Sequence, residues 1–330
     1  MGLYTKNNPL IIIYPKLPTF EIMKIESQLE KISAFKNLEL LANQIVEGFI
    51  SGMHKSPFHG FSAEFAEHKV YNPGESTKSI DWKLYARTDR LYSKRYEEET
   101  NLRCHLIIDN SSSMHYPKLK DGQAFYENKI GFSVLASAVL MDLLKRQRDA
   151  VGLSIYSDTY EYYAPEKGSG RHHRMLIDKL EGILATPKAA KATDTTTFLH
   201  QIAQKMHRRS MIILFTDMFQ PGNDEALFNA LQHLKHNKHK VVLFHVIDKK
   251  TELGFDFDNA PRKFIDLESG EEVNLFAENV KDEYEKLVAA YFKKVADTCM
   301  QYQIKYVPVS VHESFEKILT TYLVEKQKFG

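Results

Sequence analysis

The spacing of hydrophobic and polar residues changes near residue 103. Beyond it, short apolar runs alternate with longer stretches in which apolar residues recur every three or four positions. These two patterns predict buried strands and amphipathic helices. The strands are predicted at residues 103–109, 151–156, 159–163, 210–215, 240–247 and 304–309. The helices are predicted at residues 122–148, 171–184, 197–207, 224–236 and 280–300.

Alternation of apolar strands with helices is typical of a parallel sheet that is covered on both faces. We therefore predict an α/β fold with a doubly wound, mostly parallel sheet flanked by helices. The short strand at 159–163 is placed to form a hairpin with 151–156. Residues 251–275 break the alternation, and we predict an irregular insertion there, with short strands around 255–257 and 263–267.

The patterns before residue 103 are shorter. Residues 34–50 have helical spacing, whereas residues 61–71 and 91–99 have the character of strands. We predict that residues 23–102 form a small extension of one helix and β-strands. The main domain is then predicted at residues 103–330.

The first residues do not fit either part. The apolar run at 10–14 lies among prolines, and Met23 opens a clean amphipathic sequence. We interpret residues 1–22 as a tail or a misassigned start, with Met1 and Met23 as the alternative start codons.

Composition excludes several classes of protein. Of the 330 residues, 43% are hydrophobic and 26% charged, as in an ordinary soluble globular protein. The formal net charge of +1 provides no overall field to attract nucleic acid or a membrane surface. No apolar stretch approaches the ~20 residues of a membrane-spanning helix. Cys104 and Cys299 make neither a metal cluster nor a disulfide framework, so we expect a cytoplasmic location, with Cys104 filling space in the core.

The first candidate for chemistry lies where the strand at 103–109 ends. Asp109 closes the apolar run, and Ser111 and Ser113 follow on the outgoing loop. In open α/β sheets, ligands bind beyond the carboxyl ends of the strands. One carboxylate and two hydroxyls are hard oxygen ligands that suit Mg²⁺. The alternative is a turn rich in polar residues that ends a strand and binds nothing.

Two further segments are predicted to reach the same crevice. The strand at 210–215 is followed by Thr216 and then Asp217, and Thr193–Thr197 places hydroxyls at the start of a helix. Each has a structural alternative, because threonines also cap helices and an aspartate also caps turns. The combination of the three segments is more specific than any one of them.

This combination resembles the metal-ion-dependent adhesion site of von Willebrand factor A domains. Over about residues 35–250 the chain resembles the MoxR-associated von Willebrand A-like proteins, a bacterial family of unknown function. The motifs that carry the resemblance are Ser56, Gly60, Phe61, Glu64, Phe65, Tyr71, Pro73-Gly74-Glu75, Ile80-Asp81-Trp82-Lys83, Ala86-Arg87, Asp109-Asn110-Ser111-Ser112-Ser113-Met114, Arg208-Arg209-Ser210 and Phe215-Thr216-Asp217. The resemblance implies a von Willebrand A-like fold, a cytoplasmic protein and a MoxR-type AAA+ ATPase as partner. It implies no established catalytic activity.

The resemblance also implies a set of metal ligands. Asp109, Ser111 and Ser113 match the first metal loop and Asp217 matches the third. Thr193 matches the second loop, because Asp194 and Leu199 follow it at the family's spacing, although Thr195 is an alternative. We expect Mg²⁺ or another divalent cation, held by a site charge of −2 from the two aspartates. Mg²⁺ takes six oxygens, so an acidic residue of a protein client can complete the site.

A catalytic interpretation competes with this binding role. In it, the protein is a Mg²⁺-dependent hydrolase or phosphatase that acts at Asp109. A phosphatase of the haloacid-dehalogenase type would carry a second aspartate where this chain has Ser111. The sequence also lacks the Gly-x-Ser-x-Gly motif of serine hydrolases. We therefore expect an interaction module rather than an enzyme. A third, purely structural interpretation applies if no metal binds.

Overall fold

The computed structural model describes residues 37–54, 68–70, 82–94, 102–157, 160–185, 195–218, 224–236, 238–257, 261–265 and 272–329. Its centre is a six-stranded sheet in the order β10-β7-β6-β3-β4-β5. The strands are β3 (Arg103–Asp109), β4 (Ala150–Tyr156), β5 (Tyr160–Lys167), β6 (Met211–Thr216), β7 (Lys240–Ile247) and β10 (Lys305–Ser310). All neighbours pair in parallel except β5, which is antiparallel to β4. The predicted α/β fold with a mostly parallel sheet is confirmed.

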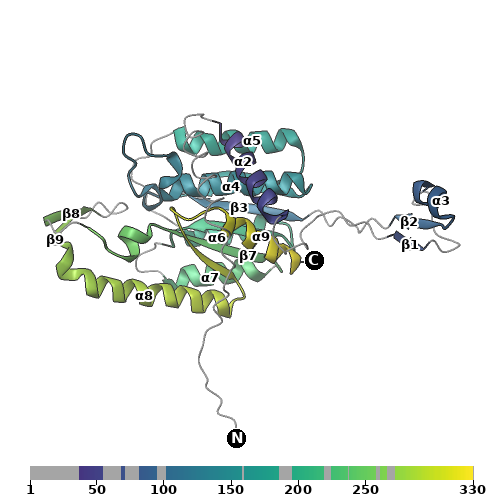
Figure 1. The fold of residues 1–330 in the computed structure, drawn as a ribbon. Helices are drawn as coiled ribbons and strands as arrows, with labels where there is room; N and C mark the ends of the chain where they lie inside the picture. Colours follow the sequence, from purple (N-terminus) through teal and green to yellow (C-terminus); the bar gives the residue numbers. More distant parts are fainter. Residues whose placement is uncertain are drawn as a thin grey trace, which may run out of the picture.

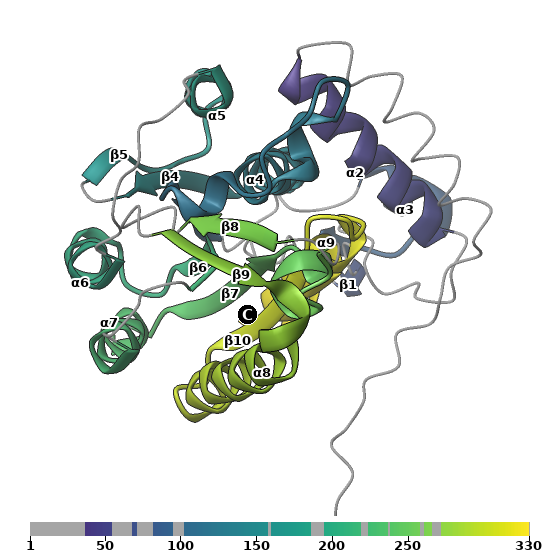
Figure 2. The ribbon, with the colours of Figure 1, turned by 90° about the vertical axis from the view of Figure 1, so that its left-hand side faces the viewer.

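Helices cover both faces of this sheet (Figures 1 and 2). One layer consists of α2 (Leu38–His54), α4 (Lys129–Arg146), α5 (Gly170–Ala185) and α9 (Glu316–Gln327). The other consists of α6 (Thr195–Lys205), α7 (Asp224–His236) and α8 (Ala277–Gln301). Successive side chains of β3 pack against opposite helix layers, because side chains alternate between the two faces of a strand. Leu106 and Ile108 therefore belong to the first core and Ile107 to the second.

The helix α4 is the most deeply buried of the described helices. Sixteen of its 18 residues are buried, because α2 and α5 pack on it while its other side lies on the sheet. It begins at Lys129, later than the predicted residue 122, because the side chain of Asn128 caps it by accepting a 2.8 Å hydrogen bond from the Gly131 amide. A short 3₁₀ turn, Phe125–Glu127, precedes the cap.

The predicted insertion differs from its expected form. A π-helical turn, Lys249–Leu253, follows β7, and β8 (Pro261–Ile265) then pairs with β9 (Glu272–Phe276) in a separate antiparallel ribbon. The strand predicted at 255–257 is wrong, because Phe255 and Phe257 pack their rings against Phe264 from an irregular segment. The strand predicted at 263–267 lies at β8. Neither β9 nor the C-terminal helix α9 was predicted.

The N-terminal elements fall into two groups. The helix α2 packs on α4, and its buried residues, including Leu41 and Val46, share the core of the sheet. Among the described strands, β1 (His68–Val70) and β2 (Tyr92–Lys94) form a two-stranded sheet of their own, with α3 (Trp82–Thr88) between them in sequence. The boundary predicted at residue 102 stays a prediction. The predicted tail at 1–22 and the segments 55–67 and 71–81 lie outside the described residues.

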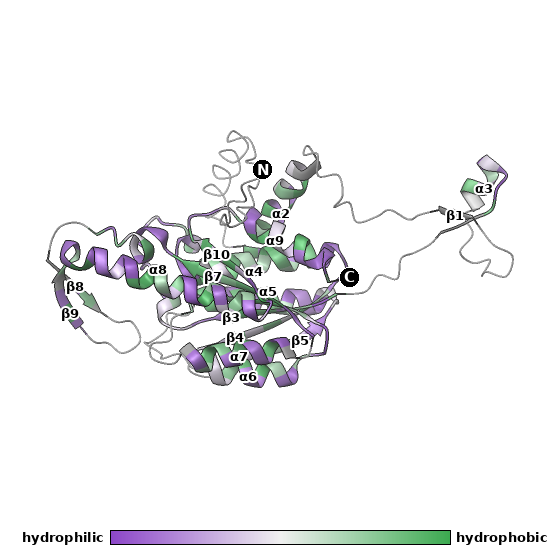
Figure 3. Cartoon of the chain, turned by 90° about the horizontal axis from the view of Figure 1, so that it is seen from below, coloured by the Kyte–Doolittle hydropathy of each residue, from purple (hydrophilic) through white to green (hydrophobic). Residues whose placement is uncertain are grey.

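Hydrophobic residues are concentrated where the helices meet the sheet (Figure 3). None of the helices in the described part of the chain combines the length and the hydrophobicity needed to cross a membrane.

Candidate metal centre

The candidate site lies where the direction of the sheet's connections reverses. From β3 the chain moves to β4 on one side, and it later returns to β6 on the other side of β3. The carboxyl ends of β3 and β6 flank this switch point, where α/β sheets bind their ligands. Asp109 is the last residue of β3, and Asp217 directly follows the last residue of β6. Both aspartates therefore lie at the carboxyl edge of the sheet, where the sequence predicted them.

Asp109 is held in a fixed orientation. It is 2% exposed, and its Oδ1 accepts a 3.0 Å hydrogen bond from the Ser111 amide. Its Oδ2 accepts a 2.7 Å hydrogen bond from Thr216 Oγ1, which in turn accepts one from the Met218 amide at 3.0 Å. The hydroxyls of Ser111 and Ser113 lie 3.1 Å apart beside it. Backbone and side-chain contacts thus pre-position the first predicted metal loop.

Burial and a second carboxylate raise the pKa of Asp109 to about 7. Burial is the larger cause and the charge of Asp217 the second, while the hydrogen bonds from Ser111 and Thr216 act in the opposite direction. Two carboxylates that share a buried site favour a proton or a cation between them. Burial and the second carboxylate are therefore both present, and each favours a positive ion beside Asp109.

A lysine that sequence reasoning missed contacts the second aspartate. Lys129 is 1% exposed, and its Nζ lies 2.8 Å from Asp217 Oδ2 and 2.5 Å from Glu252 Oε1. Burial lowers the pKa of Lys129, but the two carboxylates outweigh burial and raise it above its ordinary value. The available signal was a lone lysine at the start of a long apolar helix. No signal marked Glu252, which reaches the site from the π-helical turn after β7.

A buried hydroxyl also faces the site. Tyr156 ends β4, is fully buried, and lies close to Asp109, Thr195 and Thr216. Burial first, and then the charge of Asp109, raise the pKa of Tyr156 well above its ordinary value. Tyr156 therefore borders the candidate site from the end of β4.

The structure describes some of the remaining residues predicted to donate oxygen ligands to the metal. Ser111 and Ser113 lie with Asp109, as predicted, whereas Thr193 lies outside the described residues. Thr195, the alternative, is buried at the first position of α6 and lies near Tyr156. The described residues contain no group of three or more His, Cys, Asp or Glu side chains placed to hold a metal. The donors present are carboxylate and hydroxyl oxygens, the hard ligands that Mg²⁺ prefers.

The sequence model of one family, described as "Protein of unknown function DUF58", matches residues 67–293, more than half of the chain. The chain belongs to the DUF58 family. A relative from Mycobacterium bovis, "Uncharacterized protein Mb1516", is 23% identical over 218 residues, which cover 66% of this chain and 65% of the relative. The chain thus spans slightly less than two thirds of that relative's length.

Solved structures similar to this DUF58 protein are more distant. BatB from Bacteroides thetaiotaomicron is 14% identical with a TM-score of 0.42, over 69% of this chain and 98% of that one. The VWA domain of SpRpn10 is 12% identical with a TM-score of 0.36, over 67% and 94% of the two chains. At these TM-scores neither likeness adds to what the strand order and helix layers already show.

A second polar cluster in this DUF58 protein lies away from the metal loops. His105 Nε2 lies 2.7 Å from Ser154 Oγ, and His105 Nδ1 lies 2.6 Å from Glu166 Oε1. This is the order of a nucleophile, a base and an acid. All three side chains are buried against the sheet, however, so Ser154 is not open to a substrate. The cluster links β3, β4 and β5 within the sheet.

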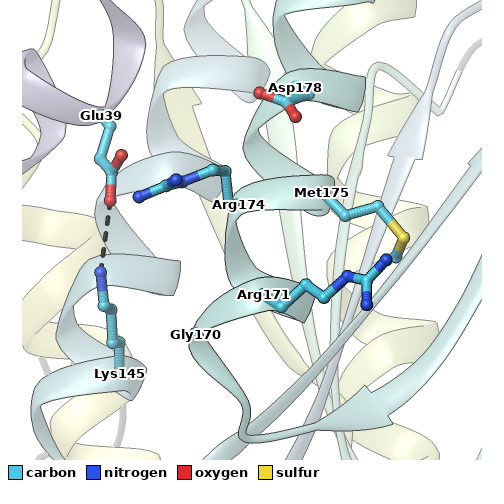
Figure 4. Close-up of a pocket in the computed structure, with 7 residues that line it drawn as sticks. All are labelled: Glu39, Lys145, Gly170, Arg171, Arg174, Met175 and Asp178. Carbon is cyan, nitrogen blue, oxygen red and sulfur yellow. Dashed lines mark hydrogen bonds and ion pairs between the residues drawn. The ribbon is translucent and has the colours of Figure 1, made fainter.

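A pocket of about 520 Å³ lies between α2, α4 and α5 (Figure 4). Its lining residues are Glu39, Lys145, Gly170, Arg171, Arg174, Met175 and Asp178. Lys145 lies near the C-terminus of α4, whereas Lys129 begins the same helix, about 24 Å away at 1.5 Å per residue. The pocket is therefore separate from the candidate metal centre.

Proposed function

We propose that this DUF58 protein is a metal-ion-dependent protein-interaction module. Asp109, Ser111, Ser113 and Asp217 would hold Mg²⁺ or another divalent cation, with Thr193 or Thr195 as the fifth protein donor. The observation that carries the proposal is the pair of buried aspartates at adjacent strand ends, which raises the pKa of Asp109 to about 7. These two carboxylates bring a charge of −2, the ion pair with Lys129 offsets part of it at Asp217, and a divalent cation would balance the rest.

The cation would serve as a docking point for another protein. Mg²⁺ prefers six oxygens and keeps some of its positions for water or a partner. A glutamate or aspartate of a protein client can take one of these positions. The specificity of the interaction would then come from the surface around the metal, since any carboxylate can bind the ion itself.

Binding is favoured over catalysis by the residue two positions after Asp109. A phosphatase of the haloacid-dehalogenase type carries a second aspartate there, whereas this chain has Ser111, whose hydroxyl lies 3.1 Å from that of Ser113. The competing function, a Mg²⁺-dependent hydrolase acting at Asp109, predicts Mg²⁺-dependent phosphate release from a generic phosphomonoester by the pure protein. We expect none.

The identity of the partner rests on the resemblance to MoxR-associated proteins. We propose a MoxR-type AAA+ ATPase, with the pair acting in the cytoplasm on the assembly or activation of client proteins. Affinity-tagged protein should retain this ATPase from a lysate in Mg²⁺ and release it in excess chelator. Asp109→Ala should not retain it, whereas the exposed Asp178→Ala should behave as wild type. Equal retention of the ATPase with and without chelator would contradict metal-dependent recognition.

A further inference from the structure

We propose that Lys129 limits the metal affinity of this site by competing with the cation for Asp217. The inference rests on the proposed function and adds a residue that opposes metal binding. The ammonium of Lys129 is already the ion-pair partner of Asp217, at 2.8 Å. A cation that binds between Asp109 and Asp217 must therefore share the second carboxylate with a fixed positive charge.

The position of Lys129 is unfavourable for a lysine in two independent ways. It is the first residue of α4, and the N-terminus of a helix repels positive charge. Its side chain is also buried, and burying an ammonium costs several kcal/mol unless it is paired and hydrogen-bonded. Local conflicts of this kind are concentrated at functional sites. A leucine or methionine here would extend the apolar face of α4 without these costs.

Its contacts join the segments that follow β3, β6 and β7. The Lys129 amide donates a 3.0 Å hydrogen bond to the Tyr116 carbonyl, and its ammonium lies 5.9 Å from the centre of the Tyr116 ring, on the segment after β3. The ammonium contacts Asp217 after β6 and Glu252 after β7. Glu252 is itself fixed, because its Oε2 accepts a 2.7 Å hydrogen bond from the Asp248 amide. Lys129 is thus held rigidly beside Asp217.

The two aspartates differ in their charge environment. Asp217 has the positive charge of Lys129 in direct contact, whereas the main groups that shift the pKa of Asp109 are Asp217, Ser111 and Thr216. Lys129 therefore offsets negative charge at Asp217, one of the two carboxylates proposed to hold the metal. Between charges about 5 Å apart, the Coulomb energy at an effective dielectric constant of ~20 is several kcal/mol when one ion is divalent. Removal of the lysine charge should therefore strengthen metal binding markedly.

The test is titration of the intact protein with Mg²⁺ and with Mn²⁺. Calorimetry measures the binding of either ion, and the loss of the free-ion electron paramagnetic resonance signal gives a second measure for Mn²⁺. Lys129→Met keeps the length of the side chain and removes its charge. We expect its dissociation constant for either ion to fall about tenfold or more. Lys145→Met is the matched control on the same helix and should leave the affinity unchanged.

A second variant guards against loss of folding. Lys129→Met leaves Asp217 and Glu252 without their cation, which can destabilise the protein. Lys129→Met with Glu252→Gln removes one acid together with the lysine and keeps the net charge of the site. This double variant should also bind metal more tightly than wild type, because Asp217 is released from its ion pair. Circular dichroism establishes that each variant is folded before titration.

The outcomes separate this inference from the proposed function. Tighter binding by both variants supports the inference, even if wild type binds no metal, in which case the proposed function fails alone. Binding by folded variants that is equal to or weaker than that of a metal-binding wild type overturns the inference alone. Failure of wild type and both variants to bind either ion overturns both.

Discussion

Thr216 Oγ1 donates a 2.7 Å hydrogen bond to Asp109 Oδ2 and so joins the ends of two adjacent parallel strands. The Thr216 hydroxyl also accepts a hydrogen bond from the Met218 amide at 3.0 Å. Met218 has a positive φ of 55°, and the Thr216 hydroxyl helps to fix the turn that carries Asp217. One side chain therefore orients both aspartates of the candidate site.

Thr216→Val should destabilise the protein by about 1–3 kcal/mol, because the buried carboxylate and the Met218 amide each lose a partner. The pKa of Asp109 should rise further, since the Thr216 hydrogen bond acts to lower it. Urea unfolding measures the first effect. Thr321→Val is the control, because that hydroxyl donates to the Lys317 carbonyl within α9, and its loss should cost about 1 kcal/mol or less. Equal losses from the two variants would contradict a special role for Thr216.

Stability in excess chelator should depend on pH through Asp109. Its pKa is raised from 3.8 to about 7 in the folded protein. The unfolded chain therefore loses the proton first as pH rises, and stability is lost between about pH 4 and pH 7. The loss should reach at most about 4 kcal/mol, at 1.36 kcal/mol per pH unit. Urea unfolding at several pH values measures it.

The Asp109→Asn variant provides the control for this pH dependence. An amide does not titrate, so the decline assigned to Asp109 should disappear while the rest of the profile is kept. At pH 8, excess Mg²⁺ should raise the free energy of unfolding of the wild-type protein and should not raise that of the Asp109→Asn variant. A decline of the same size in Asp109→Asn would show that another group causes it.

Replacement by alanine should change the stability of the protein in opposite directions at two glycines. A Cβ on Gly152 would lie 2.5 Å from His105 Nδ1 and 2.9 Å from the Ala164 carbonyl oxygen, so Gly152→Ala should cost about 1–3 kcal/mol and disturb the His105 cluster. A Cβ on Gly182, within α5, would meet no other part of the described chain within 4 Å, and Gly182→Ala should stabilise the protein by about 0.5–1 kcal/mol. Thermal unfolding of both variants measures the difference. A stabilised Gly152→Ala variant would contradict the close approach of His105.

The sequence identified those features that depend on local pattern. The strands Arg103–Asp109 and Lys240–Ile247 and the helix Asp224–His236 have their predicted bounds, because apolar runs and helical spacing are read directly along the chain. Asp109 and Asp217 followed from the same runs, since each lies at a strand's carboxyl end. The wrong strand at 255–257 came from alternating phenylalanines whose rings pack on β8 instead of pairing in a sheet.

The features that the sequence did not identify depend on distant contacts. Lys129 and Asp217 are 88 residues apart, and Lys129 and Glu252 are 123 apart. No local spacing relates such pairs, and only the strand order brings them together. Thr216 was recognised as part of a motif, but its bond to Asp109 depends on the register between β3 and β6.

The most direct test of the central claim is calorimetric titration of the metal-free protein with Mg²⁺, for wild type, Asp109→Asn and the exposed control Asp178→Asn. We expect one Mg²⁺ per chain for wild type and for the control, and no binding by a folded Asp109→Asn variant. Equal affinity in Asp109→Asn, or no Mg²⁺ binding by the wild-type protein, would contradict the claim.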